Sequence, residues 1–342
     1  MPVADTPLPP RRDDTRNFPA GAPAAGMEPE VLVAGECIVD FVPDRPGPLA
    51  DVEQFERRPG GAPANVAVRL ADLGATPYLW TRLSTDPFGD ALARTLSARG
   101  LSDRFVVRDP DARTALAFVA HEGDADRTFT FYRDGTADTR LQPGTIPDGV
   151  LSALSWVVVG GVPLSTEPSR TALVDLLRRA SECGCTTVFD PNARPELWAG
   201  GFAEAVETAL PLVDVLKATP ADLAAGGIEG SPDELLETTL AMGPHTVLLT
   251  LGADGAVARA DPGAPWGPAR TDHGGFAVDA VDATGAGDAF LAGAVWALSD
   301  GDALGEALGV ASAVAAAATT AEGAMDADID RERVREIRAG GE

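Results

Sequence analysis

Lysine is almost absent from this 342-residue sequence, which contains it once, at Lys217. The sequence also lacks a G-x-x-x-x-G-K-[ST] loop, in which a lysine and backbone amides bind nucleotide phosphates. The set of motifs that defines protein kinases is missing too. If the protein handles phosphate groups, it must therefore use backbone amides, helix N-termini, arginines and a metal ion.

Cysteine and histidine are scarce, with three residues of each. Three cysteines are too few for a disulfide framework, and nothing near the "CGC" at 183–185 completes a four-ligand metal site. The histidines are scattered, and no two have the spacing of a metal-binding pair. We therefore expect buried or partly buried thiols, and histidines that are structural or lie on the surface.

Long apolar runs and a positive net charge are also absent. No stretch of about 18 uninterrupted apolar residues occurs, so we expect no membrane span. The formal charge of −25 repels polyphosphate backbones and argues against general binding of nucleic acid. Residues 1–30 are rich in Pro, Ala and charge and lack the apolar core of a secretion signal. We expect this segment to be a disordered tail and the protein to be cytoplasmic.

From residue 31 onward, short β-branched runs alternate with longer helical segments. The runs "VLVAG", "SWVVVGG", "TTVFD", "VDVLK" and "HTVLLTLG" are continuously apolar, as in strands covered on both faces. This βαβα order predicts an α/β fold with a doubly wound, mainly parallel sheet flanked by helices. Ligands of such a sheet bind at the carboxyl ends of its strands. We expect one domain over 31–330 and a C-terminal tail over 331–342.

Two polar segments break this rhythm and predict a small β-lid. Residues 112–134 have the pattern of a hairpin around the polar turn "EGDAD", and residues 49–61 are short and strand-like. Such a sheet can close over a ligand, although an ordinary edge hairpin has the same pattern. Phe118, Phe129 and Phe131 of the hairpin would either cover the ligand or pair with a second copy, so a homodimer through the lid is one hypothesis.

The stretch "DATGAGDAF" (282–290) places small residues at the start of an apolar helix. The amides of Gly285, Ala286 and Gly287, which we call the anion hole, have no bulky side chains to keep an anion away. Asp288 follows at once, held as a carboxylate by the helix dipole, and can accept a proton from an attacking hydroxyl. An anion hole with a base is the minimum for phosphoryl transfer to an alcohol. Taken alone, the stretch favours a glycine-rich turn in which the aspartate only caps the helix.

A second glycine pair, in "GGAPANVA" (60–67), also leads into a helix. Gly60 and Gly61 permit close approach of the backbone to a ligand, and Asn65 offers a donor and an acceptor suited to a sugar hydroxyl. Together with "DATGAGDAFLAG", this stretch closely resembles the two signatures of the ribokinase-like carbohydrate kinases, the PfkB family. The resemblance extends from about residue 31 to about residue 325, and it implies a ribokinase-like fold with a β-lid.

The resemblance also implies roles for individual residues. Asp288 corresponds to the base that activates the sugar hydroxyl, assisted by the anion hole. The implied sugar contacts are Asp40, Gly60, Gly61, Asn65, Arg133 and Arg194, and the implied nucleotide contacts are Asn192, Lys217, Thr219, Thr250, Gly252 and Gly255. The implied cation ligands are Asp222, which would bind Mg²⁺ through water, and Asp282 and Thr284, which would hold a monovalent cation such as K⁺. The phosphoryl donor is expected to be ATP.

One stretch departs from the family pattern. Many members carry N-x-x-E where "KATPAD" has Thr219 and Asp222. Aspartate can replace glutamate as a hard oxygen ligand, although its shorter side chain would act through water. Threonine lacks the paired donor and acceptor of asparagine. Metal dependence and nucleotide affinity are therefore open, while activity is expected to persist.

Three segments, "GECIVDFVP", "FTFYRDGTADTRL" and "VFDPNARPELW", look most like bacterial fructokinases. The last is also similar to 2-keto-3-deoxygluconate kinases, which act on a sugar acid. Asp40 fits a neutral polyol better, because two neighbouring anions repel. The leading expectation is thus an ATP-dependent fructokinase. The alternatives are a kinase for 2-keto-3-deoxygluconate or another sugar, and a non-catalytic sugar- or nucleotide-binding relative.

Overall fold

The computed structural model describes residues 30–340 except residues 76, 123–125 and 199. The expected tail at 1–30 lies outside the described residues apart from Glu30, as does the centre of the expected "EGDAD" turn. Within the described residues, one sheet has nine strands in the order β13-β12-β11-β10-β9-β8-β1-β4-β5. In chain order these strands are β1 Val31–Ala34, β4 Tyr78–Ser84, β5 Val106–Asp109, β8 Trp156–Gly160, β9 Thr186–Asp190, β10 Val215–Ala218, β11 Thr246–Thr250, β12 Ala256–Ala260 and β13 Ala269–His273.

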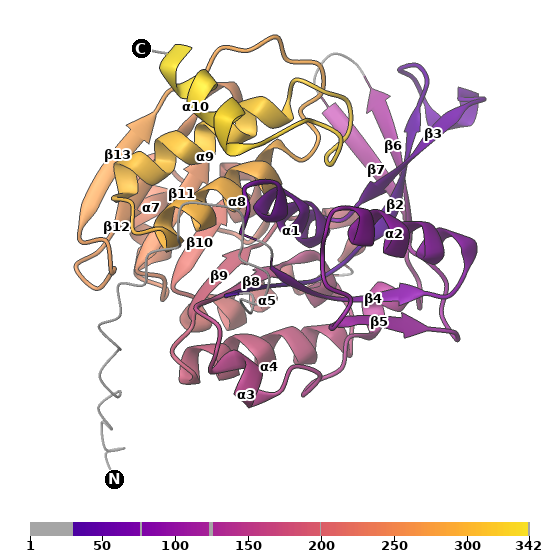
Figure 1. Ribbon diagram of the computed structural model, residues 1–342, viewed down its shortest axis with the longest axis horizontal. Coiled ribbons are helices and arrows are strands. Elements are labelled where there is room, and N and C mark those ends of the chain that lie inside the picture. The colour runs from indigo at the N-terminus through magenta and orange to yellow at the C-terminus, as the bar shows by residue number, and fades with distance from the viewer. Residues whose placement is uncertain (1–29, 76, 123–125, 199, 341–342) are drawn as a thin grey trace.

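The large sheet is parallel from β5 to β11, and only the pairs β11–β12 and β12–β13 at one edge are antiparallel. Helices cover both of its faces (Figure 1). Their bounds are α1 Ala62–Asp72, α2 Pro87–Ala98, α3 Asp148–Leu151, α4 Ser169–Glu182, α5 Phe202–Ala209, α6 Pro220–Ala225, α7 Pro232–Leu240, α8 Ala286–Ser299, α9 Leu304–Ala318 and α10 Arg331–Gly340. The predicted doubly wound α/β fold is confirmed.

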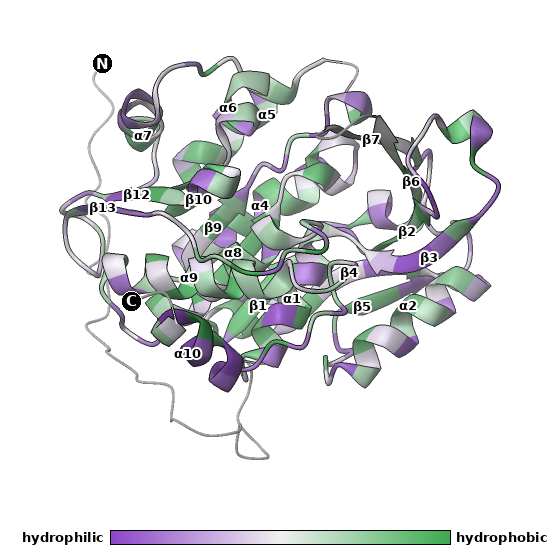
Figure 2. Cartoon of the chain, turned by 90° about the horizontal axis from the view of Figure 1, so that it is seen from above, coloured by the Kyte–Doolittle hydropathy of each residue, from purple (hydrophilic) through white to green (hydrophobic). Residues whose placement is uncertain are grey.

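Two hydrophobic cores lie on opposite faces of this sheet. One is built around α1, α8 and α9, and the other around α4, α5 and α7. Figure 2 shows the hydrophobic colour concentrated on the central strands and on α8 and α9, with polar residues toward the outside. Helices α2 and α7 begin at the N-caps Asp86 and Ser231, whose side-chain oxygens accept hydrogen bonds from first-turn amides.

A separate four-stranded sheet projects from this body, in the order β3-β2-β6-β7. Its strands are β2 Ile38–Pro43, β3 Phe55–Gly60, β6 Leu116–Glu122 and β7 Asp126–Tyr132. Beside the expected segments 49–61 and 112–134, this lid therefore includes β2, which carries Asp40. Because β2 follows β1 after only a few residues, the stretch "GECIVDFVP" (35–43) connects the two sheets.

The C-terminal segment differs from the expected tail. Residues Arg331–Gly340 form α10, which packs on α9 and buries Val334 and Ile337. These two apolar residues, three positions apart, lie on one face of the helix. Among the described residues, no helix is both long and apolar enough to span a membrane.

Candidate active site

Asp288 lies in the first turn of α8, which has Gly285 as its N-cap and Gly287 as its second residue. Gly285 adopts a left-handed backbone with φ +74°, and a Cβ atom there would lie 2.5 Å from Cβ of Ala324. Both features require glycine. The Ala286 amide donates to the carbonyl of Ala283 at 3.2 Å. The amides of Gly287 and Asp288, which have no acceptor within the helix, thus become the better anion donors.

The two glycine motifs meet through one hydrogen bond. Asn65, on the first turns of α1, donates from Nδ2 to Oδ2 of Asp288 at 2.7 Å. Both side chains are buried, and Oδ1 of Asn65 has no hydrogen-bond partner. The contact joins residues 223 positions apart. It leaves an unused acceptor beside the carboxylate, where a hydroxyl group of a ligand can donate.

Asp40 lies on lid strand β2, and the backbone of β3 passes against its carboxylate. A Cβ atom at Gly60 would lie 2.1 Å from Oδ2 of Asp40, so any larger residue there would displace this group. Burial raises the pKa of Asp40 from 3.8 to about 7; the charge of Arg194 lowers it and that of Asp288 raises it further. Asp40, Arg194 and Asp288 therefore share one electrostatic environment.

Lys217 lies beneath the anion hole. Its Nζ is 2.8 Å from Oδ2 of Asp190, both side chains are buried, and a Cβ atom at Gly287 would lie 3.0 Å from that Nζ. Burial raises the pKa of Asp288 from 3.8 to about 6, and the charge of Lys217 and the bond from Asn65 limit this rise. Near neutral pH Asp288 is thus a carboxylate, but a more basic one than a solvent-exposed aspartate.

Thr219 and Asp222, the residues that depart from N-x-x-E, form a capping box at the start of α6. Oδ2 of Asp222 accepts bonds from the amide and the hydroxyl of Thr219, and Oδ1 accepts one from the amide of Ala193 at 2.7 Å. A carboxylate has about four acceptor positions, so Oδ1 keeps one for a water molecule. In the described part of the chain, no three His, Cys, Asp or Glu side chains converge as a metal site. This donor set fits Mg²⁺ held mainly by substrate phosphates and waters.

Asp282 and Thr284 lie together before the anion hole. Oδ1 of Asp282 accepts bonds from the amide and hydroxyl of Thr284 at 2.9 and 2.7 Å, and Oδ2 accepts one from the amide of Gly323 at 2.8 Å. The group is made of hard oxygen atoms and one negative charge, which suits a monovalent cation such as K⁺. A role in cation binding stays a prediction.

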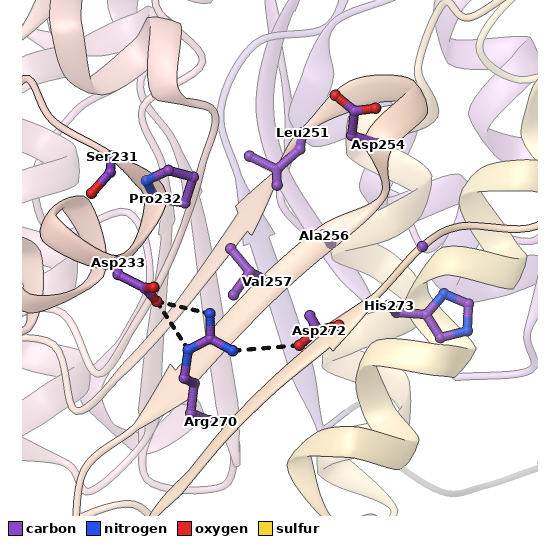
Figure 3. A pocket seen from close by; sticks show the side chains of 11 residues that line it. Ser231, Pro232, Asp233, Leu251, Asp254, Ala256, Val257, Arg270, Asp272 and His273 are labelled. Atoms are coloured by element: carbon purple, nitrogen blue, oxygen red, sulfur yellow. Dashed lines mark hydrogen bonds and ion pairs between the residues drawn. The ribbon is translucent and has the colours of Figure 1, made fainter.

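The expected nucleotide turn follows β11. Thr250 ends the strand, and Gly252 and Gly255 have φ values of +64° and +85°. A cavity of about 290 Å³ lies beside this turn, between the start of α7 and strands β12 and β13. Figure 3 shows Arg270 at its wall, bound to Asp233 and Asp272. Asn192, also expected at the nucleotide, has an unusual φ of +41° and donates its amide to Asp190.

The two arginines expected at the sugar differ in their surroundings. Arg194 lies over the ring of Phe129, 5.1 Å from its centre, and its charge acts on Asp40 and Asp288. Arg133 does not lie on the lid surface. It is buried behind the lid, with Nε on Asp138 at 2.5 Å and Nη1 on Ser165 at 2.9 Å. Only Nη2 of Arg133 has no partner, so its role as a sugar contact stays a prediction.

Two buried acids were missed from the sequence. Asp190 ends β9 and pairs with the single lysine. Glu36 follows β1, and its Oε1 accepts the amide of Ala62 at 3.0 Å at the start of α1. Burial raises the pKa of Glu36 to about 8, and the charge of Arg133 counteracts this rise. An acid at the end of a buried strand, or within two residues of it, was a usable signal for both.

The phenylalanines of the hairpin divide between the two faces of the lid. Phe118 stacks on Phe41 at 4.9 Å and contacts Phe55 and Tyr132 edge to face. Phe129 and Phe131 point to the other face, because side chains alternate along a strand. Arg194 lies over Phe129, so this second face is the one directed toward the site.

Comparison with known proteins agrees with this geometry. The sequence matches the pfkB family of carbohydrate kinases over residues 28–331. Fructokinase-1 of Zea mays is 36% identical over 277 residues, covering 78% of this chain and 82% of that protein. Fructokinase of Vibrio cholerae O395, solved with fructose, ADP and a calcium ion, is 31% identical with a TM-score of 0.79, covering 90% of this chain and 98% of that one. Fructokinase of Xylella fastidiosa with bound ATP has the same TM-score at 27% identity, covering 92% and 99%.

The chain therefore belongs to the pfkB family of carbohydrate kinases. It is a phosphotransferase that acts on an alcohol group of a sugar, with a ribokinase-like fold. The predicted family is confirmed.

Proposed function

We propose that this protein is a fructokinase that transfers the γ-phosphoryl group of ATP to the primary hydroxyl of fructose. The observation that carries the proposal is the bond between Asn65 and Asp288, which joins the sugar-side and phosphate-side motifs in one buried site. The identity of 35–36% to several fructokinases supports the choice of sugar.

In the proposed reaction, Asp40 and Asn65 hold sugar hydroxyls and place the primary hydroxyl next to Asp288. Asp288 accepts the proton of this hydroxyl as its oxygen forms a bond to the γ-phosphorus. The bond between that phosphorus and the bridging oxygen breaks, and ADP leaves. The amides at the start of α8 stabilise the negative charge on the transferring group.

Lys217 contributes from below the anion hole. Its charge lowers the pKa of Asp288, and its ion pair with Asp190 keeps the ammonium group in place beside Gly287. Mg²⁺, held through water by Asp222 and by the phosphates, would neutralise charge on the β- and γ-phosphates. Asp282 and Thr284 would hold K⁺ beside the loop of the anion hole.

The ion pair between Arg133 and Asp138 has no net charge, which favours fructose over a sugar acid as the substrate. A carboxylate on the substrate needs a free cationic group, but Arg133 already pairs with the buried Asp138. Arg194 already balances Asp40 and Asp288. A substrate carboxylate would thus lie near Asp288 and the partly ionised Asp40 without a further counter-ion.

The test is an ADP-release assay with Mg-ATP and KCl over fructose, ribose, glucose, 2-keto-3-deoxygluconate and adenosine. Highest kcat/KM on fructose, lost in Asp288→Asn, supports the proposal. Higher kcat/KM on 2-keto-3-deoxygluconate would refute the choice of sugar and keep the mechanism. No turnover on any sugar, with fructose or ATP still bound in calorimetry, would indicate a non-catalytic relative.

We also propose a homodimer through the outer lid face, defined by Phe41, Phe55, Phe118 and Tyr132. The Tyr132 side chain is 62% exposed, which is unusual for a large aromatic residue at the end of such a cluster. Light scattering of the purified protein decides this, and a monomer at all concentrations would exclude it.

The cytoplasm, which supplies ATP and free sugars, is the proposed location.

A further inference from the structure

Residues 319–327, the first part of the segment between α9 and α10, lie under the phosphate side of the site and are called the floor segment. The carbonyl of Thr319 accepts bonds from the amides of Val281 and Asp282 at 2.7 and 3.1 Å. The amide of Gly323 donates to the carboxylate of Asp282. Ala324 lies directly against Gly285, where it leaves no room for a Cβ atom. The position of this floor segment therefore determines the position of the loop that carries the anion hole.

Two arginines hold the floor segment from the main body of the protein. Arg69 of α1 is fully buried and donates to the carbonyls of Ala324 and Ala327 through three bonds. Arg99, which follows α2, donates to the carbonyl of Met325. The side chains of α1 and of the residue after α2 thus fix the backbone of the floor segment through hydrogen bonds to its carbonyls.

A third arginine holds the same segment from the lid. Arg58 of β3 donates from Nη1 to the carbonyl of Glu322 at 2.6 Å and to Asp326 at 3.0 Å, and from Nη2 to the carboxylates of Glu322 and Glu56, both at 2.7 Å. Its side chain is only 12% exposed. In Figure 1 the C-terminal segment, drawn in yellow, lies toward the lid sheet.

Arg58 also lies next to residues that are proposed to bind the sugar. In the antiparallel pair β2–β3 it lies directly opposite Asp40, and two residues later Gly60 packs on the carboxylate of Asp40. Residues directly opposite each other in such a pair have side chains on the same face. One planar guanidinium therefore connects the strand pair at the sugar to the floor under the anion hole.

We propose that Arg58 is a positioning residue that sets the distance between the sugar hydroxyl and the phosphoryl group. In this role it acts through the floor segment and not by contact with a reactant. Its ion pairs alone would contribute little, because the side chains of Glu322 and Asp326 are 67% and 49% exposed. The bond to the Glu322 carbonyl is different, since it fixes the backbone next to Gly323 and Ala324. The inference rests on the proposed function.

The experiment compares Arg58→Ala with Arg57→Ala. Arg57 is the matched control, because it is the neighbouring residue of the same strand, is exposed, and directs its side chain to the outer lid face. Light scattering checks that neither variant changes the oligomeric state. Both variants lose one positive charge. For Arg58→Ala we expect kcat to fall on the order of 10²-fold, the loss associated with a displacement of about 1 Å. The dissociation constants of fructose and ATP should stay within about threefold, since each half of the site is kept.

Two further measurements separate positioning from loss of folding. Circular dichroism should show both variants folded at the assay temperature, and Arg58→Lys, which keeps the charge but not the planar fork, should recover only part of kcat. Hydrogen exchange should be faster over residues 319–327 in Arg58→Ala than in Arg57→Ala. This readout does not require turnover, so it tests the link between Arg58 and the floor segment even if the wild-type protein phosphorylates no sugar and the proposed function fails. Equal kcat and equal exchange in the two alanine variants would overturn the inference.

Discussion

Replacement of Asp288 by asparagine should strongly lower kcat and at the same time stabilise the protein. The side chain is 9% exposed, and its volume and its bond from Asn65 can be kept, because the amide oxygen of asparagine accepts the same hydrogen bond. The change therefore removes the negative charge and the proton-accepting group while the surrounding packing remains. Loss of a general base lowers kcat by roughly 10²- to 10⁴-fold.

The stability gain follows from the raised pKa. Burial moves the pKa of Asp288 from 3.8 to about 6, which at about 1.4 kcal/mol per pH unit corresponds to about 3 kcal/mol. Because burial raises the pKa of this acid, its ionisation destabilises the native state. Ionisation is easier in the unfolded chain, so the native state loses stability as pH rises from about 4 to about 6 and carries the full cost above that. Asparagine does not ionise and avoids this cost. Lys217 loses part of its charge compensation, so about 3 kcal/mol is an upper bound.

The assay is urea unfolding of both proteins at several pH values. At pH 7.5 the variant should have the larger free energy of unfolding, by about 1 to 3 kcal/mol, and the difference should shrink toward pH 5. Fructose affinity, measured by calorimetry, should change little. A variant that is less stable than the wild type at pH 7.5, or a difference that does not depend on pH, would refute the reasoning about burial.

Three other outcomes follow from the same site. The kcat/KM of the wild type should rise with pH through about 6, because Asp288 must lose its proton before it can accept one. Lys217→Met should cost about 3–5 kcal/mol of unfolding free energy in denaturant titrations, since it leaves Asp190 buried without its partner. Gly60→Ala should raise the KM for the sugar, because the new methyl group would lie 2.1 Å from the carboxylate of Asp40.

Each of the two substitutions has a control in the same chain. The double variant Lys217→Met with Asp190→Asn removes both charges and should be more stable than Lys217→Met alone. Gly149→Ala adds the same methyl group in α3, where no atom lies within 4 Å of the new Cβ, and should leave KM unchanged. A pH-independent kcat/KM between 5 and 8 would argue against Asp288 as the base.

Local patterns predicted much of the fold. The continuous apolar runs at β1, β8, β9, β10 and β11 became adjacent strands of the parallel sheet, and the small residues before Asp288 became the start of α8. These features depend on neighbours in the chain: on the period of apolar residues, on helix caps and on the space that glycine leaves. For the same reason α10 was missed, because two apolar residues in a highly charged stretch are a weak periodic signal.

The site itself depended on contacts between distant parts of the chain. The sequence by itself determined which residue types stand at the two glycine motifs and that the family's base is present at Asp288. Only the tertiary structure decided that Arg133 turns to Asp138, that Lys217 lies under Gly287, and that Arg58 reaches the floor segment. A buried charge must find its counter-charge where the fold places one, and that position is set by packing across hundreds of residues rather than by local spacing.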